Sequence, residues 1–163
     1  MKKLIYTLLI IIALTNNSFA AGSSSDSDST PKASDYTKAK NLINAAKKYE
    51  KKGKIDKAQE RYAKAQKLLL KSNEIKPLQA DTLNYLGFTT RKLGDYEKGE
   101  KFYLLGLQVE PNHNGINEYL GELYVATNRM DMAKERLEVL KTCNCEEYEE
   151  LKEIIDGSKK SKY

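Results

Sequence analysis

Residues 83–96, LNYLGFTTRKLGDY, decide the fold, because their pattern returns 34 residues later in residues 117–130, NEYLGELYVATNRM. The Tyr-Leu-Gly triplet at 85–87 recurs at 119–121, and the helix-breaking position moves from Gly94 to Asn128. A fixed period of this length predicts stacked helical units. Such units bury their apolar faces only against neighbouring units. The repeat therefore predicts a solenoid with an extended binding surface rather than a catalytic pocket.

The same phase extends backward to a first unit in which Gly53 separates two helices. Two sets of residues with helical spacing are then expected on inner faces: Leu42, Ala45, Ala46 and Tyr49, followed by Ala58, Tyr62 and Ala65. The spacing from Gly53 to Gly94 is seven residues longer than the period, which is two helical turns. We therefore expect a long second helix over about 55–73, and Pro77 in the first turn of the next helix.

The remaining helix ends follow from local chemistry. Gly94 ends one helix and Asp95 caps the next, because its carboxylate accepts from exposed N–H groups. Asn128 plays the part of Gly94 in the third unit. Residues 146–155, EEYEELKEII, predict an amphipathic helix with an acidic first turn, which suits the cap that a solenoid needs.

Residues 36–142 resemble the tetratricopeptide repeat family. The motif residues are Leu86-Gly87, Gly94-Asp95-Tyr96, Tyr103 and Pro111, then Leu120-Gly121, Tyr124 and Ala133, and, in the first unit, Ala46, Tyr49, Gly53, Ala58, Tyr62 and Ala65. The resemblance implies an all-α solenoid of three helical hairpins plus a C-terminal capping helix. Gly99 and Gly106 replace the family's alanines, which favours close helix approach. The chain also resembles small exported proteobacterial members of this family.

In this family the first helices of successive units line a concave groove, so the resemblance implies a non-catalytic protein–protein interaction module, an adaptor or assembly factor. The implied groove residues are Lys40, Ile43, Asn44, Lys47, Asn84, Tyr85, Phe88, Arg91, Glu118, Tyr119 and Glu122. Phe88 is either an exposed binding residue beside Tyr85 and Arg91 or a contact with the long preceding helix. Glu118 and Glu122 speak against the family's carboxylate clamp, which needs Lys, Asn and Arg.

The domain organisation places helical hairpins between two polar ends. Residues 1–20 predict a signal peptide cleaved after Ala20, because a basic start precedes a short apolar run; a retained anchor is the alternative. Residues 21–34 predict a disordered Ser/Asp-rich linker. Three hairpins follow over 35–142 (35–76, 77–111 and 112–142), then the cysteine turn and capping helix over 143–156 and a disordered tail over 157–163. We expect export to the periplasm.

Charge is divided unevenly along the chain. The formal net charge is +5, yet residues 36–76 carry 13 basic and 4 acidic residues while residues 77–131 carry 5 and 8. The lysine-rich face of residues 38–54 is either a solvated surface or a site for an acidic partner. Export and the absence of interleaved arginine and aromatic residues in this stretch argue against nucleic acid. We expect a protein or peptide partner, and membrane contact only through the signal peptide.

Few residues are of a type that suits catalysis, metal binding or redox chemistry. Cys143 and Cys145 are the only cysteines, and export favours a disulfide between them. Three interpretations remain open: a structural staple, a pair of buried reduced thiols, or thiol-based redox or soft-metal binding chemistry. The last of these is the alternative function. His113 is the only histidine and lies in a turn, which makes it a poor metal ligand or general base. We therefore expect no enzyme activity, no cofactor and no metal site.

Overall fold

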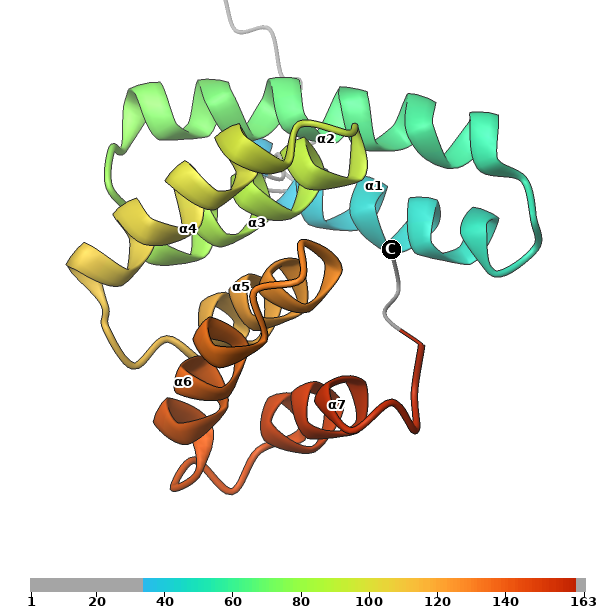
Figure 1. Cartoon of the computed structure of the whole chain (residues 1–163). Helices are drawn as coiled ribbons and strands as arrows, with labels where there is room; N and C mark the ends of the chain where they lie inside the picture. Colours follow the sequence, from blue (N-terminus) through green and yellow to red (C-terminus); the bar gives the residue numbers. More distant parts are fainter. Residues whose placement is uncertain (1–33, 161–163) are drawn as a thin grey trace, which may run out of the picture. The chain divides into compact units, whose positions relative to one another are not determined.

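The computed structural model describes residues 34–160, which belong to one compact unit spanning Ala33–Tyr163. The predicted signal peptide, linker residues 21–33 and the end of the tail, 161–163, lie outside the described residues. Between residues 34 and 160 the chain forms seven α-helices and no strand, which confirms the predicted all-α fold (Figure 1). The helices are α1 (Asp35–Glu50), α2 (Ile55–Ile75), α3 (Ala80–Lys92), α4 (Tyr96–Val109), α5 (Asn114–Ala126), α6 (Met130–Leu140) and α7 (Glu146–Ile155).

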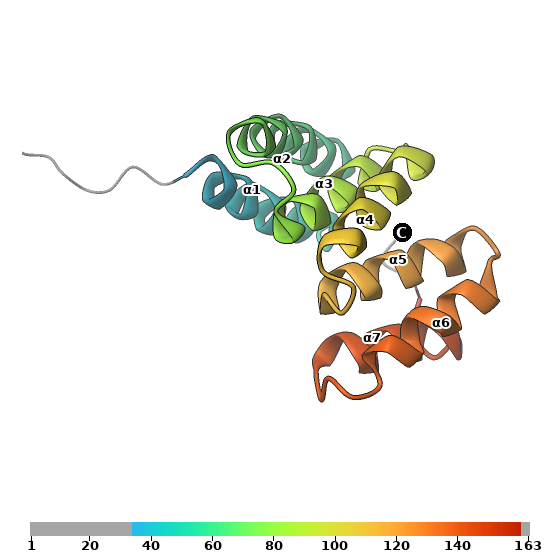
Figure 2. The same cartoon turned by 90° about the vertical axis from the view of Figure 1, so that its left-hand side faces the viewer.

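Consecutive helices pack as three antiparallel hairpins, α1 with α2, α3 with α4, and α5 with α6 (Figures 1 and 2). The turns inside the hairpins contain Gly53, Gly94 and Asn128, with φ of 67°, 96° and 58°. These left-handed values suit glycine and asparagine, so the predicted turn positions are confirmed. The helix α7 packs mainly on α5 and also on α6. No helix within residues 34–160 is both long and apolar enough to span a membrane.

Small residues allow the helices to approach closely. A Cβ added at Gly87 would lie 2.5 Å from Tyr103 of α4, and one at Gly106 would lie 2.5 Å from Ile116 of α5. The expected close approach at Gly106 is therefore present. A Cβ at Gly121 would lie 2.5 Å from Leu151, which fixes α7 against α5.

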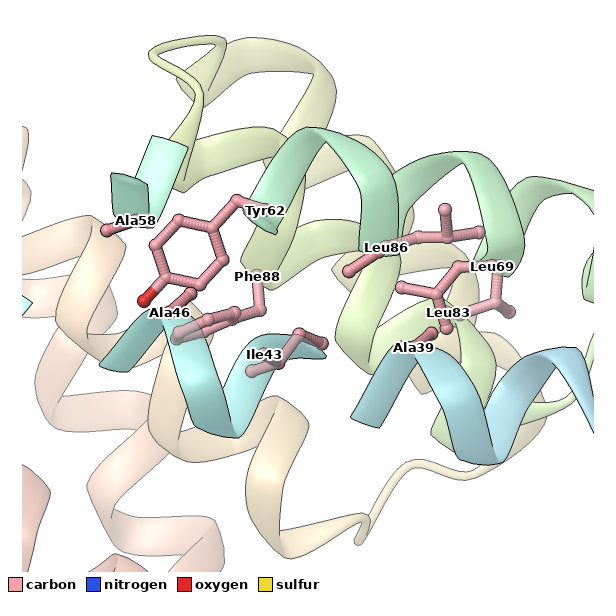
Figure 3. Packing of buried hydrophobic residues seen from close by; sticks show 10 residues of the cluster. Ala39, Ile43, Ala46, Ala58, Tyr62, Leu69, Leu83, Leu86 and Phe88 are labelled. Carbon is pink, nitrogen blue, oxygen red and sulfur yellow. The ribbon is translucent and has the colours of Figure 1, made fainter. Parts of the chain in front are cut away.

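The first hydrophobic cluster lies between α1, α2 and α3. Ala39, Ile43 and Ala46 of α1 are at most 1% exposed and face the two other helices (Figure 3). Leu42 and Tyr49, which the sequence placed on this inner face, are only partly buried at its edge. The inner face of α1 therefore lies about one residue from its predicted position.

The connection between the first two hairpins differs from the prediction in one respect. The second helix is long, as expected, with 21 residues. Pro77, however, lies in the turn before α3 and not in its first turn, so that prediction is wrong. The neighbouring Leu78 has a φ of 57°, which interrupts the backbone before the helix begins at Ala80.

Candidate functional site

The groove predicted along α1, α3 and α5 is largely closed by its own side chains. Six of the eleven predicted residues are at most 5% exposed: Ile43, Asn84, Phe88, Arg91, Glu118 and Glu122. Lys40 and Asn44 are exposed, whereas Lys47, Tyr85 and Tyr119 are partly exposed. Their predicted exposure on a groove surface is therefore corrected, although four of the six, Asn84, Phe88, Arg91 and Glu118, form inner walls of the pockets described below. Whether the other five bind a partner stays a prediction.

Phe88 fills the middle of this region (Figure 3). Its ring centroid lies 5.7 Å from that of Tyr62 in α2 and 5.1 Å from that of Tyr119 in α5. The ammonium of Lys47 lies 4.7 Å from the Phe88 centroid and donates to the Tyr119 hydroxyl at 3.2 Å. Phe88 is 2% exposed, so the interpretation as an exposed binding residue is wrong and contact with the long helix is confirmed. Lys47 and Tyr119 thus join the first and third hairpins across α3.

Arg91 joins the second and third hairpins from inside. Its guanidinium donates to the backbone carbonyl of Tyr119 at 2.8 Å and to Glu122 at 3.3 Å. Both ionised side chains are fully buried, and a buried charge needs such partners to offset the loss of its hydration. Carboxylate oxygens of Glu118, Glu122 and Glu150 lie within 4.8 Å of one another, while Lys159 pairs with Glu150 at 3.1 Å. This cluster belongs to the packing of α7 on α5.

An opening lies on each side of this closed middle. The first, the basic–apolar pocket, has a volume of about 740 Å³ and lies where the C-terminal ends of α1 and α3 meet the first turns of α2 and α4. Its accessible members include Lys51 and two apolar side chains, Ile55 (54% exposed) and Tyr96 (41% exposed). The complete lining is Lys47, Glu50, Lys51, Ile55, Gln59, Phe88, Arg91, Lys92 and Tyr96.

A fixed set of polar contacts forms the wall of this pocket. Glu50 accepts from the Tyr62 hydroxyl at 2.8 Å and pairs with the Lys92 ammonium at 2.7 Å. Gln59 donates to the Lys92 carbonyl at 2.8 Å. Burial, and then the hydrogen bond to Glu50, raises the pKa of Tyr62, so its hydroxyl keeps its proton and donates. The contacts hold α1, α2 and α3 together around the opening.

The second opening, the polar pocket, has a volume of about 350 Å³ and lies at the first turns of α3, α5 and α7. Four carboxylate residues line it, Asp81, Glu110, Glu118 and Glu147. The other lining residues are Asn84, Tyr85, Asn112, His113, Asn114, Gly115 and Tyr119. The two pockets therefore lie at opposite ends of α3 and carry opposite charge.

Beside the polar pocket, α1 presents Lys40 to two aromatic rings. The Lys40 ammonium lies 5.6 Å from the centroid of Tyr36 and 5.9 Å from that of Tyr85. Burial raises the pKa of both phenols, and the nearby carboxylate of Asp81 adds to this effect. The rings therefore stay neutral and present cation-binding faces.

His113 and the cysteines take structural positions. The His113 ring accepts from the Ile116 N–H at 3.2 Å and so caps α5, a role that histidine rarely fills. Cys143 and Cys145 form a disulfide with Cα atoms 5.2 Å apart, between the end of α6 and the start of α7. The Cα separation lies within the range that a disulfide requires, which agrees with a structural staple at this turn.

Sequence reasoning missed several residues of both pockets. Ile55 and Tyr96 line the first pocket beside Lys51 of the predicted basic face, and Asp81 and Glu147 line the second. The available signal was the change from a basic first unit to an acidic second and third unit. That signal gives the charge of each region but not the side chains that meet in space.

The helices and their packing define an all-α domain of stacked helical hairpins. A scan against protein-family models gave no match, and a search of curated proteins gave none either. Among solved structures, 46 chains match. One is the first TPR of Spaghetti (RPAP3) bound to the HSP90 peptide SRMEEVD, with 23% identity, 77% of this chain and 95% of that chain covered, and a TM-score of 0.47.

A second similar structure is the first TPR domain of human RPAP3, with 23% identity, 77% of this chain and 98% of that chain covered, and a TM-score of 0.47. This chain is thus similar to tetratricopeptide repeat domains. The fold assignment rests on the seven described helices and their packing, and no binding residue is carried over from these structures.

Proposed function

We propose that this domain is a non-catalytic interaction module that binds an acidic segment of a protein partner in the basic–apolar pocket. The observation that carries the proposal is the composition of that pocket, in which Lys51 lies beside the exposed apolar side chains of Ile55 and Tyr96. Large apolar side chains next to a cation favour a ligand that combines an apolar anchor with a negative charge.

Charge supports this choice of ligand. The first hairpin carries most of the excess positive charge of the chain, and the pocket opens at its turn. A basic region attracts an acidic partner during encounter, while the apolar side chains hold it after contact. The predicted groove and the predicted basic face of residues 38–54 meet in this one pocket, because Lys47 and Lys51 line it together with Phe88 and Arg91.

The biological setting is part of the proposal. An exported chain with this pocket suits an adaptor or assembly factor in the periplasm. The domain needs no cofactor for such a role. Its only histidine is committed to the first turn of α5.

The test uses an array of peptides in which acidic and apolar positions vary independently, followed by fluorescence anisotropy with the best peptide. We expect binding to need both an acidic residue and an apolar one. Lys51→Glu should weaken binding about fivefold or more, because it replaces attraction with repulsion. Lys67→Glu is the matched control, since Lys67 is an exposed lysine of α2 outside the pocket. Equal loss in both variants would show that only the net charge matters.

The alternative is thiol-based redox or soft-metal function at Cys143 and Cys145. The disulfide lies beside a third opening, of about 410 Å³, lined by Lys141, Cys145 and Tyr148 among others. A Cys143→Ser/Cys145→Ser variant separates the two functions. We expect it to bind the selected peptide with unchanged affinity. Loss of binding in that variant alone would favour the thiol function.

A further inference from the structure

We propose that the polar pocket binds a primary ammonium group, supplied by a lysine side chain or by the amino terminus of a peptide. The pocket is separate from the basic–apolar pocket and lies at the other end of α3. The proposal does not depend on an acidic peptide binding in the basic–apolar pocket. It rests on the charge of the lining, on one buried acceptor and on the state of His113.

Carboxylates from four separate segments meet around the pocket. Asp81 comes from the first turn of α3, Glu110 follows α4, Glu118 comes from α5 and Glu147 from α7. Neither lysine nor arginine lines the opening. Like charges held near one another favour a cation between them, since each carboxylate is stabilised by the same positive group.

Asn84 supplies the observation that points to a ligand. Its side chain lines the pocket, the residue is 5% exposed, and its Oδ1 has no hydrogen-bond donor among the described residues. The amide nitrogen faces Gly115, where an added Cβ would lie 2.8 Å away. A buried acceptor without a donor costs about 1–3 kcal/mol. A ligand that donates to Oδ1 removes this cost.

The state of His113 favours an organic cation over a metal ion. Its Nδ1 accepts from the Ile116 N–H at 3.2 Å, so a neutral ring carries its proton on Nε2. That Nε2 lies 3.2 Å from Asp81 Oδ1, to which it donates. Neither nitrogen then offers a lone pair to a metal. The imidazole instead holds the Asp81 carboxylate in place.

Size and donor number agree with an ammonium ligand. The volume of about 350 Å³ is far larger than that of one water, about 30 Å³, and so far larger than a single ion needs. A primary ammonium carries three N–H donors. These suit Asn84 Oδ1 together with two carboxylates. The aromatic ring of Tyr85, which also lines the pocket, can cover the alkyl chain.

The test is a nitrogen-15 NMR titration of the full chain, read at the side-chain amide of Asn84 and the backbone amide of Gly115. The probes are Nα-acetyl-lysine methylamide for the side-chain ammonium and glycinamide for the amino-terminal ammonium. Nα-acetyl-norleucine methylamide is the uncharged control, and calcium chloride is the metal control. We expect the lysine probe, glycinamide or both to shift these resonances saturably, and norleucine not to shift them.

Variants separate a built site from general attraction. Glu147→Gln should weaken binding of the shifting probe about fivefold, the upper range for one partly exposed charge pair. Glu149→Gln is its matched control, because it makes the same change on α7 outside the pocket. Asp81→Asn, at a side chain that is 70% exposed, serves if Glu147→Gln does not fold. The proposal is overturned if neither ammonium probe shifts Asn84, if calcium shifts it at lower concentration, or if both α7 variants weaken binding equally.

Discussion

Replacing Phe88 with alanine distinguishes a core residue from a binding residue. Phe88 is 2% exposed and its ring meets Tyr62 and Tyr119 at centroid distances of 5.7 and 5.1 Å. Truncation of a buried phenylalanine removes transfer energy and leaves a cavity, at a cost of about 3–5 kcal/mol. The Lys47 ammonium above the ring adds about 0.5–1 kcal/mol of lost attraction. Because a domain has roughly 5–15 kcal/mol of stability, Phe88→Ala should lose a large part of it.

The assay is urea unfolding followed by far-ultraviolet circular dichroism. We expect Phe88→Ala to lower the midpoint with an unchanged slope, which reports a loss of stability without a change in exposed surface. Phe88→Leu keeps much of the apolar volume and should lose about 1.5 kcal/mol. Leu104→Ala is the control, because Leu104 is a helical residue that is 42% exposed. It should lose less than about 1 kcal/mol.

Equal midpoints for Phe88→Ala and Leu104→Ala would refute this reasoning. Phe88 would then lie at a surface, and the interpretation as an exposed groove residue would be restored. The same assay decides how any binding data on Phe88 are read. A variant that is partly unfolded binds less ligand even if the substituted residue never contacts the ligand.

Three further predictions concern other parts of the domain. Gly121→Ala should lower the free energy of unfolding in urea by about 1–3 kcal/mol, because its Cβ would lie 2.5 Å from Leu151. A double-mutant cycle with Leu151→Ala should show coupling between the two sites, and additive effects would contradict the contact. Reduction of the Cys143–Cys145 disulfide should speed hydrogen exchange in α7 and leave exchange in α1 to α4 unchanged. The lost loop constraint should lower the free energy of unfolding by about 1.5 kcal/mol, because the loop is short. Faster exchange in all helices would contradict a local staple. Burial raises the pKa of several tyrosines above the unfolded value of about 10, and three of them serve as the test. Their contribution to stability is complete below about pH 10 and falls as pH rises further. Ultraviolet titration should show these three ionising only with unfolding, and ionisation of all tyrosines while the helices remain folded would contradict this. The three tyrosines are Tyr62, Tyr103 and Tyr119.

The helices could be predicted from sequence because their ends depend on local chemistry. Gly53, Gly94 and Asn128 occupy left-handed turns, and the Asp95 carboxylate accepts from the Lys98 N–H at 3.0 Å as an N-cap. Each of these residues acts within a few positions of itself. The prediction for Pro77 failed because no local residue type marks the break before α3. The positive φ there belongs to Leu78, and sequence reasoning expects such a φ at glycine or asparagine.

The candidate site could be predicted only in part, because exposure depends on distant elements. The 34-residue period correctly put Arg91 and Glu122 on the helices that face one another, but it carried no information on what lies between them. Arg91 reaches across to the Tyr119 carbonyl at 2.8 Å and is buried. A pattern of positions on the first helices of successive units therefore identifies residues on one side of a solenoid without showing which of them contact water.

The position of α7 accounts for the burial of the acidic groove positions on α5. A regular fourth unit would continue the stack, whereas α7 packs mainly on α5, where Leu151 seats against Gly121. Glu150 thereby comes near Glu118 and Glu122, and Glu147 comes to the polar pocket. Nothing in residues 146–155 alone specifies that α7 packs mainly on α5, since any amphipathic helix with one apolar stripe could cap the stack. The closed middle at Phe88 and the docked α7 together leave pockets of opposite charge at the two ends of α3.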